Sequence, residues 1–361
     1  MVDLVVFEPI VIKSYRGPYQ VDFCENIAAL FDRSLIENSH FIIDRNIAKL
    51  YSKVLKDVLA SESVLLIDAT EENKSLERFP GYVSHLMNNG LRRQHRLVAI
   101  GGGITQDITC FLAATILRGV DWWFYPTTLL SQADSCIGSK SSVNSGNVKN
   151  ILGTFTPPKQ IFIHPGFLDT LSKADIYSGI GEIIKVHAID GIDSCRQLAQ
   201  DYQQLFDNAD TMQHYIRQAL LIKQSIIEQD EFDRGVRNVM NYGHTFGHAI
   251  ESATEYAIPH GIAVTIGMDM ANFIAYRLGK AAEAFFESMH SVLKRNYHLF
   301  KNTPIPIDAF INAIGKDKKN KGKSQLCLIL PNCDGKLSRV YIENDCKFRG
   351  LVVEYLAKER N

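Results

Sequence analysis

The sequence of 361 residues lacks an excess of charge of either sign: Lys and Arg number 39, Asp and Glu number 40, and the formal net charge is −1. That balance argues against a protein whose main task is to neutralise nucleic-acid phosphates or to lie on an anionic membrane. No uninterrupted apolar run approaches the roughly 18–20 residues that would span a bilayer. The first residues also lack the basic segment, apolar core and small-residue cleavage site of a signal peptide. We therefore expect neither a nucleic-acid nor a membrane partner.

The seven cysteines are scattered along the chain, and no two of them form a C-x-x-C pair. An odd number of cysteines without such a framework predicts reduced thiols and a cytoplasmic location. It also speaks against a zinc site built from thiolates. If the protein binds a metal ion, histidine and carboxylate side chains must hold it.

The composition, with 46% apolar and 22% charged residues, is that of a globular protein, and the length suggests two domains. In the first half, short runs rich in Ile, Val and Leu alternate with amphipathic stretches, which predicts βαβ units and a parallel sheet covered by helices. The predicted strands are 40–44, 63–68, 96–100, 122–125 and 160–164, with helices at 46–59 and 75–89. After about Pro165 long helical patterns dominate, at 174–189, 211–228, 237–256 and 262–278. We expect an α/β domain over residues 1–165 and a mainly α-helical domain over 166–361.

A run of three glycines, Gly101 to Gly103, follows the strand 96–100 and opens a predicted helix over 104–117. Such a turn lets backbone N–H groups approach a pyrophosphate at the helix N-terminus. The dinucleotide fingerprint is incomplete, because Gln106 stands where its third glycine belongs. A tight turn without a ligand explains the motif about equally well. Polar residues follow other predicted strands at 44–46, 71–74 and 126–130, and ligands bind at this edge of open α/β sheets.

The segment 237–251 carries a polar stripe. Read as one helix, it places Arg237, Asn241, His244, His248 and Glu251 along a single face with apolar neighbours. Such a stripe is costly to bury without partners, so we interpret it as the lining of a pocket.

Histidine and carboxylate residues near this stripe suggest a metal site. His244 and His248 are spaced to bind one ion, and 259–261 forms a turn that presents His260. Upstream, Glu182 and Lys185 are three residues apart and share a helix face. One Glu and two His with an open position is a typical catalytic zinc arrangement. The residues alone leave open which two histidines bind.

Cations are the third group of candidates. A small site lined by Arg118, Lys140, Lys185, Lys223 and Arg237 would suit a substrate that carries phosphate and carboxylate groups. For any single lysine, the alternative is a surface cation whose stem lies on apolar groups.

Taken together, these motifs make the chain resemble 3-dehydroquinate synthase and the wider sugar-phosphate cyclase family, from about residue 40 to residue 325. The matching motifs lie at 101–107, 118–119, 126–130, 134–140, 149–150, 181–185, 237–251, 260–261 and 317–320. Several motifs in the right order are far more specific than a glycine turn alone.

The resemblance implies a Rossmann-like NAD domain, a helical C-terminal domain that binds zinc or cobalt, and a homodimer. It implies the metal ligands Glu182, His244 and His260. The implied substrate and catalytic residues are Arg118 (from the partner subunit), Asp134, Lys140, Asn150, Lys185, Lys223, Arg237, Asn241, His248 and one of Lys318 or Lys319. The implied NAD contacts are Asn46, Glu71, Lys74, Gly102, Gly103, Asp107, Thr127, Thr128, Lys149 and Thr170.

The implied reaction converts a seven-carbon phosphorylated keto sugar acid, 3-deoxy-arabino-heptulosonate 7-phosphate, to 3-dehydroquinate with release of phosphate. It is a step of the shikimate pathway to the aromatic amino acids. Because NAD is regenerated, the enzyme is a lyase despite its cofactor. Arg237 and Asn241 favour a carboxylated substrate. The alternatives are a cyclase that resembles 2-deoxy-scyllo-inosose synthase or one that acts on sedoheptulose 7-phosphate, and an NAD- and metal-dependent polyol dehydrogenase.

The chain departs from the family pattern at several positions. Gln106 and Ser139 stand where the family usually has glycine, and Val148 replaces the glycine before Lys149. The first 40 residues do not show the family's usual glycine-containing hairpin. These changes lie in the glycine turn that is implied to bind NAD and in the segment from Ser139 to Asn150 that is implied to contact the phosphate. They leave the implied metal ligands intact.

Overall fold

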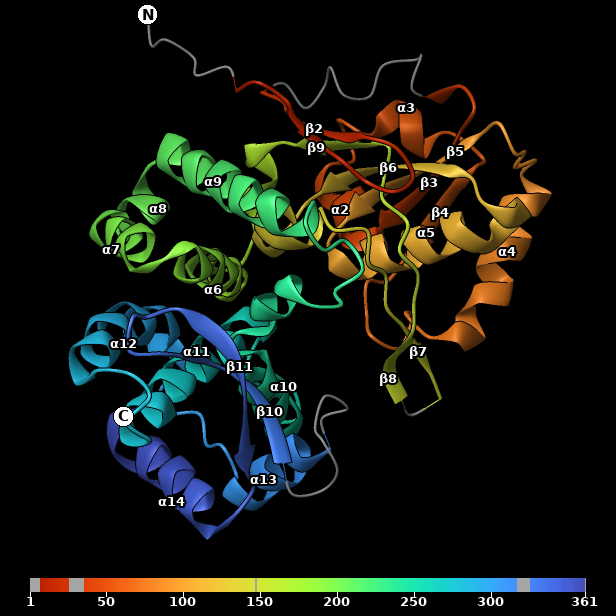
Figure 1. Cartoon of the computed structure of the whole chain (residues 1–361). Helices are drawn as coiled ribbons and strands as arrows, with labels where there is room; N and C mark the ends of the chain where they lie inside the picture. The colour runs from red at the N-terminus through yellow and green to blue at the C-terminus, as the bar shows by residue number, and fades with distance from the viewer. Residues whose placement is uncertain (1–6, 26–35, 147, 317–324, 361) are drawn as a thin grey trace, which may run out of the picture. The chain divides into compact units, whose positions relative to one another are not determined.

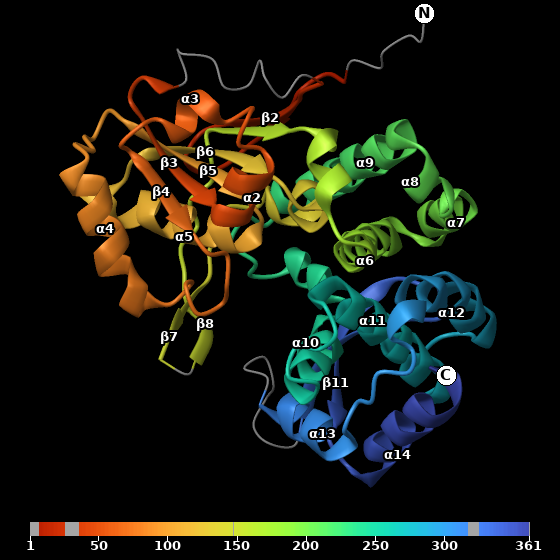
Figure 2. The same ribbon diagram turned by 180° about the vertical axis from the view of Figure 1, so that it is seen from behind.

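The computed structural model describes residues 7–25, 36–146, 148–316 and 325–360. The chain divides into two compact units, residues 1–171 and 172–361, and each is described here by itself. The sequence put the boundary after residue 165, where the 3-10 helix η5 (Pro165–Thr170) begins. The predicted fold class is confirmed: unit 1 is built on a parallel sheet and unit 2 is mainly helical (Figures 1 and 2).

The sheet of unit 1 has seven strands in the order β1-β2-β9-β6-β5-β3-β4. All neighbours pair in parallel except β1 and β2. The strands are β1 (Ile10–Ile12), β2 (Tyr19–Phe23), β3 (Ser39–Asp44), β4 (Val64–Ile67), β5 (Arg96–Gly101), β6 (Asp121–Pro126) and β9 (Gln160–Ile163). Each of the five predicted strands is therefore present, within two residues at either end.

The antiparallel pair β1–β2 corrects one expectation. The first 40 residues do contain a hairpin, and Gly17 lies between its strands with φ +95°. The motif escaped notice because both strands are short and the first has three residues.

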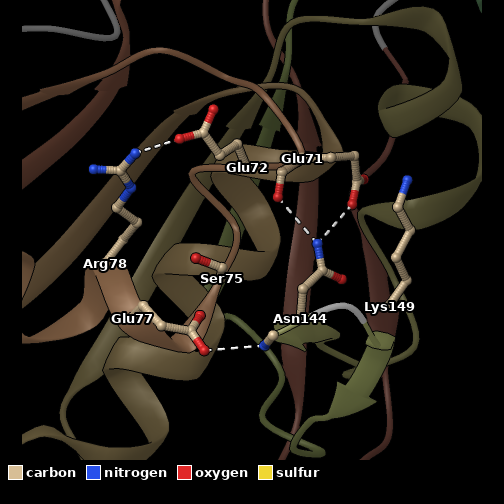
Figure 3. Close-up of a pocket in the computed structure, with 8 residues that line it drawn as sticks. Glu71, Glu72, Ser75, Glu77, Arg78, Asn144 and Lys149 are labelled. Carbon is tan, nitrogen blue, oxygen red and sulfur yellow. Dashed lines mark hydrogen bonds and ion pairs between the residues drawn. The ribbon is translucent and has the colours of Figure 1, made fainter.

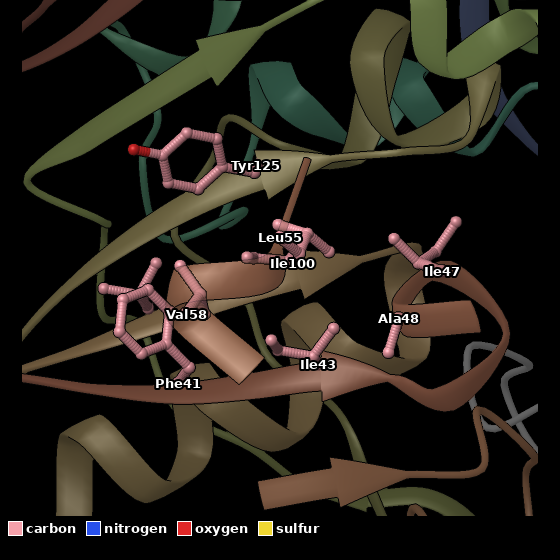
Figure 4. Packing of buried hydrophobic residues seen from close by; sticks show 9 residues of the cluster. Phe41, Ile43, Ile47, Ala48, Leu55, Val58, Ile100 and Tyr125 are labelled. Atoms are coloured by element: carbon pink, nitrogen blue, oxygen red, sulfur yellow. The ribbon is translucent and has the colours of Figure 1, made fainter. Parts of the chain in front are cut away.

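The core of unit 1 lies on both faces of the sheet, as parallel strands require. On one face, Phe41 and Ile43 of β3 pack with Val98 and Ile100 of β5 and with the helices α2 (Arg45–Leu50) and α3 (Lys56–Leu59) (Figure 4). The helix α5 (Gly103–Thr115) also contacts β3, β5 and β6. The predicted helix 46–59 is thus two short helices. Tyr51 ends the first, and its hydroxyl donates to the carbonyl of Gly166 at 2.9 Å.

A helix and a small ribbon are further parts of unit 1. The helix predicted at 75–89 begins later, because the 3-10 turn η2 (Leu76–Arg78) precedes α4 (Phe79–Asn88). A small antiparallel ribbon, β7 (Val143–Ser145) with β8 (Val148–Leu152), extends from the sheet domain (Figure 1).

The strand order also locates a binding crevice. The parallel strands lie in the order β4-β3-β5-β6-β9. The chain therefore passes from β3 to β4 on one side, and from β5 to β6 and then β9 on the other side. This is the 2-1-3-4-5 order of flavodoxin-like sheets, in which ligands bind beyond the carboxyl ends of the first and third strands. Residues 44–46 and 101–103 follow those two ends.

Unit 2 is built around α11 (His260–Arg277), which is buried along most of its length and contacts α6, α10 and α12. Its other α-helices are α6 (Lys173–Asp190), α7 (Ile192–Asp201), α8 (Gln204–Asp207), α9 (Ala209–Ile227), α10 (His244–Ala253), α12 (Glu283–Tyr297), α13 (Ile307–Gly315) and α14 (Cys346–Glu354). A hairpin of β10 (Gln325–Pro331) and β11 (Leu337–Glu343), which the sequence did not predict, packs on α11 and on η6 (Val236–Asn241). The part of the chain that the structure describes has no helix that is both long and apolar enough to cross a lipid bilayer.

The single helix predicted over 237–256 is wrong. The chain forms the 3-10 helix η6, breaks at Tyr242 and Gly243, and restarts as α10. Gly243 has φ +74°, and a Cβ there would lie 2.6 Å from the carbonyl oxygen of Val264 on α11. The break therefore lets the chain pass close to α11, and Arg237 and Asn241 do not continue the helix face of the histidines.

Candidate functional site

The glycine turn in unit 1 has the geometry of a nucleotide-binding turn. Gly102 precedes α5 as its N-cap, and a Cβ there would lie 2.9 Å from Cγ2 of Thr128. Thr127 donates its N–H to the carbonyl of Gly101 at 2.9 Å, while its own buried hydroxyl has no hydrogen-bond partner among the described residues. The close-packed backbone of Gly102 and Gly103 at the start of α5 and this buried hydroxyl fit a bound dinucleotide.

Other predicted NAD contacts lie around the carboxyl ends of neighbouring strands. Asn46 lies in the first turn of α2, where the carboxylate of Asp44 accepts its N–H at 2.9 Å, and burial raises the pKa of Asp44. The hydroxyl of Thr170, in η5, lies 3.2 Å from that of Tyr51. Thr128 exchanges hydrogen bonds with Ser131 in the turn after β6.

Lys74 is the centre of a polar network. Only 5% of this residue is exposed, and its Nζ lies 3.2 Å from Glu71 Oε1, 3.2 Å from Asp107 Oδ2 and 3.1 Å from Asn150 Oδ1. Burial alone lowers the pKa of Lys74, but the charges of Asp107 and Glu71 raise it overall. For Asp107 burial outweighs Lys74, and its pKa is raised. The structure thus brings together three predicted NAD contacts and Asn150, which the resemblance assigned to the phosphate.

Asn144 joins the same network, and the sequence did not single it out. Its side-chain N–H groups donate to the backbone carbonyl of Glu71 at 3.0 Å and to the Glu71 carboxylate at 2.9 Å (Figure 3). Its Oδ1 accepts from the N–H of Asn150 at 2.9 Å, and its own N–H donates to the carbonyl of Lys74. Burial pushes the pKa of Glu71 upward, but Asn144 and the cations Lys74 and Lys149 lower it overall. Asn144 therefore connects Glu71 and Asn150 and helps to keep Glu71 ionised.

The remaining candidates of unit 1 lie on loops with unusual backbone. Asp134 is buried within η4 (Ser131–Ser135), a π-helical turn after β6. Lys140 is exposed and follows Ser139, whose φ is +61°. Arg118 is also exposed and has φ +65°. Left-handed backbone is costly for residues other than glycine and is concentrated at functional sites.

In unit 2, three side chains from three helices meet at one point. Glu182 on α6 is 1% exposed, and its Oε1 lies 3.8 Å from His244 Nε2 on α10 and 3.5 Å from His260 Nε2 at the start of α11. One ligand atom from each lies within 4.8 Å of the other two, so this group could hold a metal ion. Two imidazole nitrogens and one carboxylate suit a divalent transition metal with an open position.

Each imidazole is oriented by a second partner. His260 Nδ1 lies 3.2 Å from Glu251 Oε2, and His244 Nδ1 lies 3.2 Å from the backbone carbonyl of Tyr242. Metal-binding histidines usually donate their other N–H in this way, which fixes the tautomer. Burial by itself lowers the pKa of His260, but the hydrogen bond and charge of Glu251 raise it overall.

His248 is the fourth polar residue of this cluster. Its ring centre lies 5.4 Å from that of His244 and 5.7 Å from that of His260, and its side chain is exposed. With Glu251 and His260 it forms a second group of possible ligands, which shares His260 with the first. The structure therefore brings together the α10 part of the predicted stripe, His244, His248 and Glu251.

Glycines explain why α6 and α11 bring Glu182 and His260 together. A Cβ on Gly261 would lie 1.9 Å from the carbonyl oxygen of Ser178, and one on Gly181 would lie 2.3 Å from the carbonyl oxygen of Gly261. The main chains of the two helices therefore touch beside both residues. Ser178 Oγ also accepts the N–H of Gly261 at 2.9 Å.

The cationic candidates of unit 2 come from elements that contact one another: α6, α9 and η6. Lys185 on α6 is buried and forms an ion pair with Glu182. Lys223 on α9 and Arg237 on η6 are also buried, and the carbonyl of Glu231 accepts from Arg237 Nη1 at 2.5 Å. Asn241 donates to the carbonyl of Asn238 at 3.1 Å. Lys318 and Lys319 lie outside the described residues.

Two family models match successive segments of the chain. Residues 64–178 match the family model for the 3-dehydroquinate synthase N-terminal part, and residues 179–320 match the model for the C-terminal part. A 3-dehydroquinate synthase of Thermoanaerobacter sp. (strain X514) is 34% identical over 340 residues, which are 92% of this chain and 95% of the relative.

Two solved structures are similar over nearly the whole chain. A 2-deoxy-scyllo-inosose synthase complexed with carbaglucose-6-phosphate, NAD+ and Co2+ covers 97% of this chain and 99% of its own, with 23% identity and a TM-score of 0.83. ValA, the 2-epi-5-epi-valiolone synthase of Streptomyces hygroscopicus subsp. jinggangensis 5008 with NAD+ and Zn2+ bound, covers 95% and 97%, with 26% identity and a TM-score of 0.80.

Proposed function

Because the chain belongs to the 3-dehydroquinate synthase family, we propose that it converts 3-deoxy-arabino-heptulosonate 7-phosphate to 3-dehydroquinate and releases phosphate. The observation that carries this proposal is the group of Glu182, His244 and His260, whose ligand atoms lie within 4.8 Å of one another. The two similar structures contain NAD+ with Co2+ or Zn2+, so NAD and zinc or cobalt are the cofactors we propose here.

The metal ligands are Glu182, His244 and His260 in this proposal. When bound, the ion supplies Lewis-acid polarisation of a substrate oxygen, and NAD accepts a hydride and returns it. Glu251 holds the His260 ring through Nδ1, so Nε2 faces Glu182 and would be the atom that binds the ion. Lys185 offsets the negative charge of Glu182 in a buried setting.

The substrate contacts follow the chemistry of the candidate side chains. Lys140, Asn150 and His248 bind the phosphate in this proposal, and Lys185 adds a cation. Lys223, Arg237 and Asn241 bind the carboxylate and ring hydroxyls, with Asp134. The carbonyl of Glu231 holds the Arg237 guanidinium in a fixed orientation, which suits planar recognition of a carboxylate.

The NAD contacts in this proposal are the residues around the carboxyl ends of the strands. They are Asn46, Glu71, Lys74, Gly102, Gly103, Asp107, Thr127, Thr128, Lys149 and Thr170. An ionised Glu71, as favoured by Asn144 and Lys74, would accept hydrogen bonds from a ribose hydroxyl.

The location and assembly are also part of the proposal. All seven cysteines are described and none forms a disulfide, which agrees with a cytoplasmic location. We propose a homodimer in which the exposed Arg118 reaches the site of the partner subunit.

The decisive assay measures phosphate release and NADH absorbance with NAD and zinc. The substrates are 3-deoxy-arabino-heptulosonate 7-phosphate, sedoheptulose 7-phosphate and glucose 6-phosphate, and products are identified by mass. We expect phosphate and 3-dehydroquinate from the first substrate, without net NADH. Turnover of only a neutral sugar phosphate would assign another cyclase, and steady NADH without phosphate would assign a polyol dehydrogenase.

Arg237→Ala tests the carboxylate assignment. We expect KM for the carboxylated substrate to rise by about 10²-fold, because a charged hydrogen-bond pair is lost. Arg234→Ala, at an exposed arginine in the preceding loop, is the control. An unchanged KM in the Arg237 variant would remove this residue from the substrate site.

A further inference from the structure

Gln106 stands where the resemblance to the family led us to expect a glycine, and the structure gives its side chain a specific partner. It lies in the first turn of α5, is 6% exposed, and exchanges two hydrogen bonds with Ser135 of η4. Its Nε2 donates to the carbonyl of Ser135 at 2.6 Å, and the Ser135 hydroxyl donates to its Oε1 at 2.6 Å. One amide thus binds both the main chain and the side chain of a single residue.

Ser135, the partner of Gln106, belongs to a turn with an unusual hydrogen-bond pattern. The segment 131–135 is a π-helical turn, closed by the bond from the N–H of Cys136 to the carbonyl of Ser131 at 3.0 Å. π-helical turns are rare and often occur at functional sites. Asp134, a proposed substrate contact, lies within this turn, directly before Ser135. Holding Ser135 therefore restricts the backbone that carries Asp134.

The glycine turn, Gly101 to Gly103, is held by main-chain hydrogen bonds instead. Thr127 donates its N–H to the carbonyl of Gly101, and the backbone N–H of Gln106 donates to the carbonyl of Gly102 at 3.0 Å. Both bonds involve only the main chain, so they persist when the side chain of Gln106 is changed. The side chain of Gln106 thus supports the π turn and not the glycine turn.

We propose that Gln106 is a positioning residue for the sugar phosphate: through Ser135 it fixes the π turn that carries Asp134 against the first turn of α5. This inference rests on the proposed function and adds a specificity element to the same site. A glycine at this position would leave that turn without its side-chain support.

Three variants test the proposal: Gln106→Met, which keeps the shape of the side chain and loses both bonds, Ser135→Ala, which loses one bond, and the double variant. Gln203→Met, on the exposed surface between α7 and α8, is the matched control. Hydrogen exchange followed by mass spectrometry reports on the turn without reference to activity. We expect faster exchange over residues 130–140 in Gln106→Met and unchanged exchange over residues 103–115.

Binding and kinetics measure the consequence. In Gln106→Met we expect KM for the sugar phosphate to rise about tenfold, with the Kd for NAD from calorimetry changed by less than about twofold. The double variant should resemble Gln106→Met, because both substitutions act on the same connection between Gln106 and Ser135. Unchanged exchange over 130–140, or an equal rise in the Kd for NAD, would overturn the proposal. If Gln106→Met does not fold, Ser135→Ala carries the same test, with a smaller rise expected.

Failure of this inference is distinct from failure of the proposed function. If the unmodified protein releases no phosphate from any of the three sugar phosphates, the proposed function fails. If it releases phosphate and the Gln106 and Ser135 variants match it in exchange and in KM, only the positioning role fails.

Discussion

In unit 1 the candidate residues are held by side-chain hydrogen bonds between segments far apart in the sequence, whereas in unit 2 the candidate ligands are held by helices whose main chains touch. Lys74 and Asn144 of unit 1 connect residues more than 70 positions apart through polar side chains. Gly181 and Gly261 of unit 2 let the main chains of α6 and α11 touch. A polar network can lose one member and keep its backbone, but a main-chain contact cannot admit one added carbon without moving a helix. The two sites should therefore respond differently to substitution.

The largest effect is expected at the ligand group of unit 2. Glu182→Gln removes the carboxylate and leaves the buried Lys185 without its ion-pair partner, so we expect activity to fall by at least about 10³-fold with loss of bound metal. Metal content by mass spectrometry and phosphate release are the measurements. Glu251→Gln should lower metal affinity by about 10–100-fold, because it acts through His260. Full metal content in Glu182→Gln would contradict the ligand assignment, and Glu287→Gln, at an exposed position of α12, is the control.

The sequence predicts features that depend on local patterns better than features that depend on contacts between distant residues. The strands β3, β4, β5, β6 and β9 of unit 1 were found because period and composition are local properties. His244 and His248 were found as a pair because they are four residues apart on one helix. The choice of Glu182 and His260 came from the resemblance, since residues on three helices share no local pattern.

Two features were beyond the reach of local patterns. The polar stripe from Arg237 to Glu251 had the right spacing for one helix, yet Gly243 takes a left-handed conformation to pass α11. Asn144 was missed because its partner Glu71 is 73 residues away, and a single asparagine near a turn is common. In both cases a tertiary contact decided the outcome.

The main-chain contact in unit 2 can be broken by one methyl group. Gly261→Ala places a carbon 1.9 Å from the carbonyl oxygen of Ser178, and we expect it to lower the free energy of unfolding by about 3 kcal/mol. Gly81→Ala in α4 meets nothing within 4 Å and should be neutral or stabilising by up to about 1 kcal/mol. Urea denaturation measures both. Equal stability of the two variants would mean that α6 and α11 can move apart freely.

The network of unit 1 should tolerate loss of a member with a smaller cost. Asn144→Leu removes the donor to Glu71 and the acceptor for Asn150, and we expect the Kd for NAD to rise about tenfold. Calorimetry measures it. Glu71, Asn144 and Glu72 line one pocket (Figure 3). Glu72→Gln, at the exposed ion-pair partner of Arg78, serves as control. Unchanged NAD binding in Asn144→Leu would show that Glu71 is oriented without it.

The smallest effect concerns backbone strain. Ser139 has φ +61°, and Ser139→Gly should raise the free energy of unfolding by about 0.5–1 kcal/mol, because glycine adopts this conformation without steric cost. Ser84→Gly within α4 should have the opposite sign, at about 0.5 kcal/mol. Chemical denaturation of both variants compares them. A destabilised Ser139→Gly variant would indicate that contacts of the serine side chain outweigh the strain.

The contact between α6 and α11 has a consequence for engineering. Because the main chains of these helices already touch at Gly181 and Gly261, no choice of neighbouring side chain can bring the two helices closer together, and a larger residue at either glycine would move a helix. Attempts to change which ion the protein prefers should therefore begin with the outer partners of the imidazoles, Glu251 and the Tyr242 carbonyl, rather than with the spacing of the helices.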